Sequence, residues 1–153
     1  MPCSQLPTER RSLDELVAAA DPGSNRDPGS AERAARELAD VGRARHHDDL
    51  VTEAEVWLCI HLLEQGKLAD AIRSSHGVRE RLRGHAPGSR LGSARMELLR
   101  TIALAGSEAG EFGLAMSAAQ ELASDPDLHA DAALDAAFSL AVCLERMGDN
   151  WQA

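Results

Sequence analysis

A short motif occurs three times in this chain, and it strongly limits the folds that the rest of the sequence can form. In each copy a glycine follows a long apolar segment and an alanine comes five residues later: Gly66 and Ala71, Gly110 and Ala115, Gly148 and Ala153. Glycine adopts the left-handed backbone conformation that ends a helix. A small alanine lets the next helix cross back at close range. The motif therefore predicts helix–turn–helix units.

The segments before these glycines also match one another. A large residue lies eight positions before each glycine and a small one lies seven before it: Leu58 and Cys59, Ile102 and Ala103, Leu140 and Ala141. Self-similarity at regular intervals is the signature of a repeat architecture. The three segments are therefore expected to occupy equivalent places in successive units.

Helix-breaking residues gather in a few short stretches, which leaves long segments free to be helical. Since 44% of the residues are apolar but only 3% are aromatic, Ala and Leu must fill the core, which favours closely packed helices. No segment shows the alternating pattern of strands. We predict an all-α fold of about seven helices, at residues 13–20, 31–45, 50–65, 68–83, 94–109, 112–124 and 128–147.

Helix starts are predicted from capping residues. Ser12 and Glu15 have the spacing of a capping box. Ser30 is the predicted cap of the second helix, and Asp48 or Asp49 that of the third. The glycine-rich segment 84–93 is predicted to be a loop.

The repeated motif resembles the tetratricopeptide repeat, a helix–turn–helix unit of about 34 residues. The hinge glycines are 44 and 38 residues apart, and the first excess matches the length of the loop at 84–93. The resemblance implies antiparallel helix pairs stacked as a short right-handed solenoid. Its units would span about 9–45, 48–83, 93–124 and, incompletely, 128–153, after a flexible leader at 1–8.

In tetratricopeptide repeats the first helix of each unit lines a concave groove. Carried over position by position, the resemblance implies a groove with an apolar centre and a charged rim, which suits an extended or helical peptide. The residues expected to line it are Glu53, Val56, Ile60, Leu63, Arg100, Leu104, Phe138, Val142 and Arg146. The alternative is that helices further along the protein fill the groove.

The net charge of −9 limits the class of partner. An acidic chain repels phosphate backbones and anionic membranes, so we expect neither nucleic acid nor a membrane as a partner. A basic or amphipathic peptide is the easier ligand. Cys3, Cys59 and Cys143 are too far apart for a zinc site, and their odd number fits no closed disulfide set, so we expect a cytoplasmic protein without a metal or cofactor.

Structural roles best explain the other residues that could bind a metal or take part in catalysis. His46, His47, Asp48 and Asp49 are neighbours on a predicted turn, where their side chains diverge. Ser75 and His76 are adjacent on a helix and lack a nucleophile elbow. His61 is expected at the boundary of the core. The arginines between Arg73 and Arg95 are interpreted as a solvated helix face or, alternatively, as a site for an acidic segment.

These observations lead to a functional hypothesis. We expect a non-catalytic interaction and regulatory scaffold, the N-terminal module of a larger bacterial signalling protein, since the repeats resemble those that precede diguanylate cyclase (GGDEF) domains. Alternatives are the helical sensor region of a transcriptional activator and a stand-alone adaptor. An enzyme would need convergent polar residues in a pocket.

The predicted seventh helix has no return helix to cover it. Leu140, Leu144 and Trp151 would then form an exposed apolar strip. We therefore expect self-association, as a homodimer through the C-terminal end.

Overall fold

The structure is a computed structural model that describes residues 11–24, 26–86, 88–124 and 130–152, without the side chains of 130–132, 135 and 149–152. Within these ranges the chain forms seven α-helices and no strand, which confirms the predicted all-α class. The helices are α1 (Leu13–Ala20), α2 (Pro28–Ala44), α3 (Asp48–Glu64), α4 (Leu68–Leu82), α5 (Arg90–Ala109), α6 (Phe112–Ala123) and α7 (Ala130–Gln152). The predicted leader at 1–8 lies outside the described residues.

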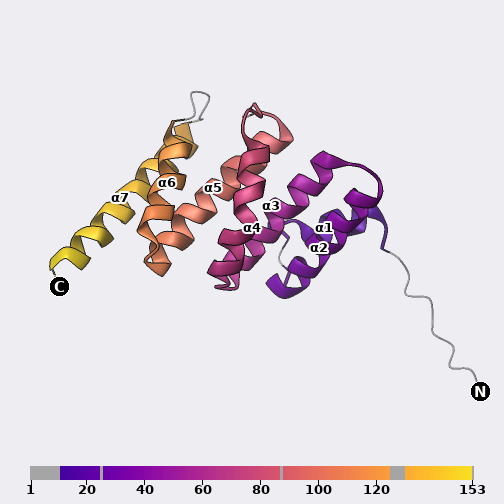
Figure 1. The fold of residues 1–153 in the computed structure, drawn as a ribbon, viewed down its shortest axis with the longest axis horizontal. Coiled ribbons are helices and arrows are strands. Elements are labelled where there is room, and N and C mark those ends of the chain that lie inside the picture. Colours follow the sequence, from indigo (N-terminus) through magenta and orange to yellow (C-terminus); the bar gives the residue numbers. More distant parts are fainter. Residues whose placement is uncertain (1–10, 25, 87, 125–129, 153) are drawn as a thin grey trace, which may run out of the picture.

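The helices form an elongated row with α1 and α2 at one end and α7 at the other (Figure 1). Helices α1, α3, α5 and α7 follow one another along the row, each packed on the next in this series. Helices α2, α4 and α6 each pack on the helices directly before and after them in the chain. Backbone contacts among α2, α4 and α6 themselves are absent from the described residues.

Two of the three predicted glycine hinges form as expected. Gly66 (φ 71°) and Gly110 (φ 81°) are both left-handed. The residue after each glycine donates its N–H to a carbonyl five residues back, from Lys67 to Leu62 (2.9 Å) and from Glu111 to Gly106 (2.8 Å). This bond closes a Schellman motif, and in both places it turns the chain directly into a return helix.

The third prediction is wrong, because α7 continues through Gly148 to Gln152. A glycine costs an exposed helix only about 1 kcal/mol, so it does not end a helix by itself. The third hinge instead lies between α2 and α3, at His46 (φ 55°), where His47 donates to the Gly42 carbonyl at 2.9 Å. A Cβ at Gly42 would lie 2.8 Å from Val51 Cγ2, so this close helix crossing requires glycine.

The capping residues explain where the helix starts differ from the prediction. The Ser12–Glu15 capping box is present, with both of its hydrogen bonds. Helix α2 begins earlier than predicted because Asp27, rather than Ser30, is its cap. Helix α5 begins at Arg90 because the Ser89 hydroxyl accepts a hydrogen bond from the Gly92 N–H at 3.0 Å, which shortens the predicted loop.

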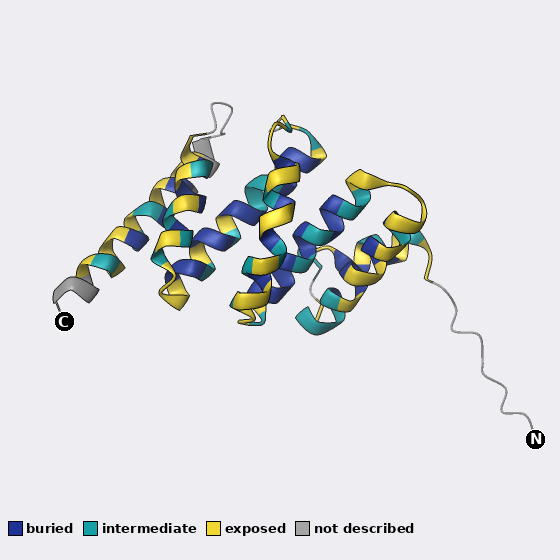
Figure 2. Cartoon of the chain, viewed as in Figure 1, coloured by how far each residue is buried: buried dark blue, intermediate teal, exposed yellow. Residues whose placement is uncertain are grey.

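Small side chains and leucines fill the core along the row (Figure 2). Cys59 and Cys143 are buried as free thiols. Burial, reinforced by the nearby Glu55 carboxylate, raises the pKa of Cys59 to about 12, so this thiol stays protonated. None of the helices, as far as they are described, has the length and apolar character needed to cross a bilayer.

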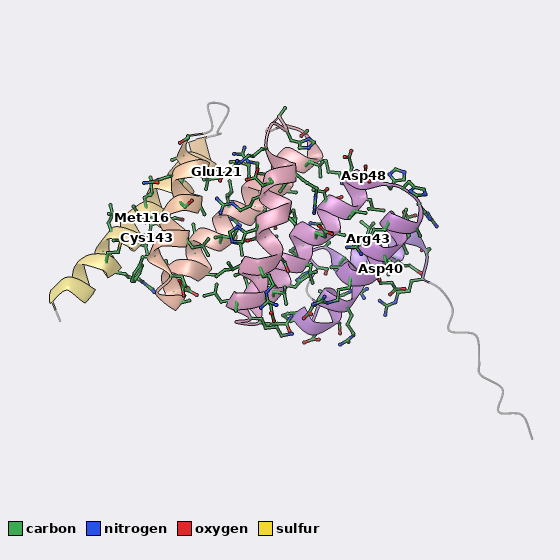
Figure 3. The ribbon with its side chains drawn as sticks, in the orientation of Figure 1. Asp40, Arg43, Asp48, Met116, Glu121 and Cys143 are labelled. Carbon is green, nitrogen blue, oxygen red and sulfur yellow. The ribbon has the colours of Figure 1, made fainter. Side chains whose placement is uncertain are left out.

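Carboxylates that accept from two cations connect neighbouring helices. Glu55 on α3 pairs with Arg43 of α2 and with Arg81 of α4. Glu121 on α6, labelled in Figure 3, pairs with Arg79 of α4 at 2.6 Å and with Arg95 of α5 at 3.0 Å. Burial opposes ionisation of Glu121, but hydrogen bonds from the two arginines outweigh it and lower its pKa. These bridges join α2, α4 and α6 to the rest of the row.

A third bridge fixes the turn before α4. The Glu32 carboxylate of α2 accepts from Lys67 at 2.9 Å and also from Arg36 and Gln65. The hydrogen bond from Lys67, followed by that from Arg36, lowers the pKa of Glu32 from 4.5 to about 2. Its ionised form therefore stabilises the folded state above pH 4.5, and this contribution is lost as the pH falls toward 2.

Replacing Gly148 by alanine tests the revised hinge assignment. Because Gly148 is helical and has open space around it, Gly148→Ala should raise the free energy of unfolding by about 0.5–1 kcal/mol. Gly110→Ala should lower it by about 1 kcal/mol or more, because alanine is strained at a φ of 81°. Urea denaturation measures both. A loss of stability in Gly148→Ala like that in Gly110→Ala would contradict the continuous α7.

Removing the Glu32 charge tests the bridge. Glu32→Gln should lower the free energy of unfolding at pH 7 by about 1–3 kcal/mol, and its difference from wild type should shrink as the pH falls toward 2. The control is Glu80→Gln, because the exposed Glu80–Arg83 pair should contribute at most about 1 kcal/mol. Equal effects of the two variants at pH 7, measured by denaturation, would argue against the bridge.

Candidate functional site

Half of the predicted groove is part of the core. Glu53, Val56, Ile60 and Leu63 of α3 are all buried, with exposed fractions of 9% or less. Four other helices, α1, α2, α4 and α5, pack on α3. Glu53 also forms an ion pair with Arg90 of α5 at 2.6 Å. The prediction that these four side chains form an open surface is therefore wrong for the described structure.

The other half of the predicted groove is accessible. Leu104 of α5 is 40% exposed and Phe138 of α7 is 63% exposed. Arg100 is exposed and Val142 is half-buried. The exposed Arg146 reaches back to donate to the Ser107 carbonyl at 3.1 Å, which links α7 to α5. We call these five residues (Arg100, Leu104, Phe138, Val142 and Arg146) the α5–α7 surface.

Three carboxylates from different helices gather beside this surface. Glu97 lies on α5, three residues before Arg100, and is partly buried. Burial raises the pKa of Glu97, Arg100 and His61 oppose the rise, and Asp21 and Glu64 add to it. Asp21, at the end of α1, and Glu64, at the end of α3, are thus close enough to repel Glu97. This acidic cluster (Asp21, Glu64 and Glu97) gives the α5–α7 surface a negative neighbour.

His61 has a structural place next to the cluster. Its ring is only 2% exposed, so it lies inside the core rather than at the predicted boundary. Nε2 lies 2.7 Å from the Ala20 carbonyl oxygen and must carry a hydrogen, because a carbonyl only accepts. Nδ1 lies 3.1 Å from Glu64 Oε2. Nε2 thus joins α3 to the end of α1, whereas the Nδ1 contact lies within α3.

The other histidine and serine candidates do not converge. His46 and His47 are exposed on the α2–α3 turn, and neither Asp48 nor Asp49 caps α3, whose N-cap is His47 without a side-chain hydrogen bond. No group of three His, Cys, Asp or Glu side chains in the described ranges is arranged to hold a metal ion. Ser75 is buried and donates to the Ile72 carbonyl at 2.8 Å, whereas the adjacent His76 is exposed.

The basic stretch is a set of structural ion pairs. Arg73, Arg79, Arg81, Arg83, Arg90 and Arg95 each have a carboxylate partner within the chain. Their charges are therefore already compensated. Arg73, Arg83 and Arg90 are largely exposed, as a solvated face predicts. Arg79 and Arg95 are mostly buried.

A pocket of about 560 Å³ lies where α1, α3 and α5 begin, and sequence reasoning missed it. Its apolar residues are Leu13, Val17, Leu50 and Leu91, and its charged or titratable ones are Asp14, Arg45, His47, Asp49, Glu53 and Arg90. Acidic and basic groups are mixed, so the pocket favours neither sign of ligand charge. No local sequence signal marks it, because three helices far apart in the chain contribute.

Helix α7 has a side that other helices leave uncovered. Leu134, Phe138 and Leu144 are exposed by 70%, 63% and 57%. Of the residues predicted for self-association, Leu144 is thus exposed, whereas Leu140 packs partly against the core. The side chain of Trp151 lies outside the described residues.

Comparisons with known proteins were made at three levels. No family model, no curated protein and no solved structure matches this chain.

Proposed function

We propose that this chain is a non-catalytic protein-interaction scaffold that binds a peptide segment of a partner on the α5–α7 surface. The observation that carries the proposal is the exposure of two large apolar side chains, Leu104 and Phe138, on neighbouring helices of the row. Large apolar side chains exposed together mark interaction sites. The surrounding Arg100 and Arg146 form a polar rim of the kind found at protein interfaces.

The partner segment is an amphipathic peptide with basic residues. Its apolar side contacts Leu104 and Phe138, and its cations face the acidic cluster. Repulsion among Asp21, Glu64 and Glu97 is relieved when a cation approaches, which favours binding of such a peptide. The net charge of −9 adds long-range attraction. Nucleic acid and anionic membranes are disfavoured for the same reason.

A tetratricopeptide-like stacking of the helices is part of the proposal. The row of α1, α3, α5 and α7, with α2, α4 and α6 as return helices, supports it. We place the chain as the cytoplasmic regulatory module at the N-terminus of a larger bacterial signalling protein such as a diguanylate cyclase. The helical sensor region of a transcriptional activator, or a stand-alone adaptor, are the alternatives. The reading frame after Ala153 distinguishes them.

Truncating Phe138 tests the binding surface. A fluorescent amphipathic Leu–Lys peptide of about 18 residues, or five turns, serves as the probe in anisotropy titrations. Phe138→Ala and Leu104→Ala should each weaken binding by about tenfold, as expected at the centre of an interface. Leu134→Ala is the matched control, since Leu134 is similarly exposed on α7 but is not part of the surface. Equal losses in all three variants would reject the assigned surface.

Neutralising Glu97 separates binding from stability. Its pKa is raised in the folded state, so its ionisation at neutral pH opposes folding. Glu97→Gln should therefore raise the free energy of unfolding at pH 7, by less than about 1 kcal/mol, with no gain at a pH where the wild-type carboxyl is protonated. The same variant should bind the basic peptide a few-fold more weakly. Glu111→Gln, an exposed acid at the α6 N-cap, is the control. Tighter binding by Glu97→Gln would contradict the role of the cluster.

A further inference from the structure

Helices α3, α5 and α7 are equivalent when they are aligned on Gly66, Gly110 and Gly148. The residue twelve positions before each glycine is fully buried in all three: Ala54, Leu98 and Ala136. The alignment predicted from sequence is thus retained in the burial pattern, even though Gly148 does not end α7.

A second side of the three helices is buried only where a return helix follows. The positions seven and four before the glycine are Cys59 and Leu62 in α3 and Ala103 and Gly106 in α5, and all four are buried. In α5 the contact with the return helix is very close, because a Cβ at Gly106 would lie 3.3 Å from the Ala115 Cβ.

The same two positions are open in α7. Ala141 is exposed, and Leu144 is exposed by 57%. Figure 2 shows this end of the row as largely exposed. Helix α7 therefore presents the face that α3 and α5 use to bind α4 and α6.

The return helices share a pattern on their buried side. In both, a small residue is followed by another small residue four positions later and by an aliphatic residue seven positions later: Ala71, Ser75 and Val78 in α4, and Ala115, Ala119 and Leu122 in α6. None of these residues is charged. Such a side allows close approach of a facing helix.

Helix α7 itself carries this pattern on its open face. Ala137, Ala141 and Leu144 have the same spacing and the same sequence of small, small and aliphatic residues, and all three are exposed. The open face of α7 is thus complementary to a second copy of itself. It contains no charge at these positions, so the net charge of −9 does not act directly across it.

We infer that two copies of this chain pair through antiparallel α7 helices, each of which serves as the return helix of the other. Antiparallel pairing of identical faces has two-fold symmetry, as expected for a homodimer. Ala141 is the middle residue of Ala130–Gln152, so pairing centred there overlaps the whole helix. It also brings Phe138 of one copy opposite Leu144 of the other, which covers both exposed side chains. The inference does not rest on the proposed peptide binding.

Charge substitutions at Ala141 test the symmetry axis. By sedimentation at roughly 100 µM chain, where even a modest association with a Kd of about 10 µM is populated, the wild type should be a dimer. Ala141→Arg and Ala141→Glu should each be monomeric, because the two substituted residues would face each other. Mixing the two variants should restore a dimer containing one of each. Ala44→Arg is the matched control, since Ala44 is exposed on α2 at the other end of the row, and this variant should remain dimeric.

Two further measurements make the outcome unambiguous. Thermal denaturation should show that the Ala141 variants remain folded, since Ala141 is exposed. The Ala141→Arg chain should still bind the basic peptide on the α5–α7 surface, so failure of dimerisation and failure of the proposed function are distinguishable. A monomeric wild type, or a dimer that persists in both Ala141 variants, would overturn the inference.

Discussion

The close approach of helices at three turns is the constraint on which the rest of the structure depends. Gly42 and Gly106 leave room for Val51 and Ala115 of the following helices, and Ala71 is fully buried at the equivalent place after Gly66. Each turn also closes through a hydrogen bond that spans five residues. Because the backbone fixes the angle at which the next helix leaves, the row can be built largely from Ala and Leu, with few aromatic residues.

Ion pairs connect helices that the close crossings at the turns do not join. Backbone contacts between any two of α2, α4 and α6 are absent from the described part of the chain. Glu55 and Glu121 each accept from arginines on two other helices and thereby connect the return helices along the row. Because Arg79, Arg95 and Glu121 are largely buried, loss of Glu121 would remove the carboxylate that both arginines share and leave two cations in the interior without it.

Sequence reasoning succeeded where one local signal decides the structure. Gly66 and Gly110 mark two turns because a left-handed residue there favours glycine. It failed at His46, since an occasional non-glycine residue in this conformation has no signature in composition. Sequence reasoning also wrongly assigned Val56 and Ile60 to an open surface. The reason is that the packing of other helices on α3 cannot be predicted from the residue spacing within α3. The other half of the predicted groove is accessible because α7 has neighbours on fewer sides.

The two proposed surfaces meet on α7, and this has a thermodynamic consequence. Phe138 belongs to the α5–α7 surface, yet in the antiparallel pairing it also lies opposite Leu144 of the second copy. A peptide that covers Phe138 and a second copy that covers it therefore compete for one apolar side chain. By linkage, peptide binding weakens dimerisation by the same coupling free energy as dimerisation weakens peptide binding. A scaffold arranged in this way would convert occupancy by a partner into a change of oligomeric state, which is a property expected of a regulatory module.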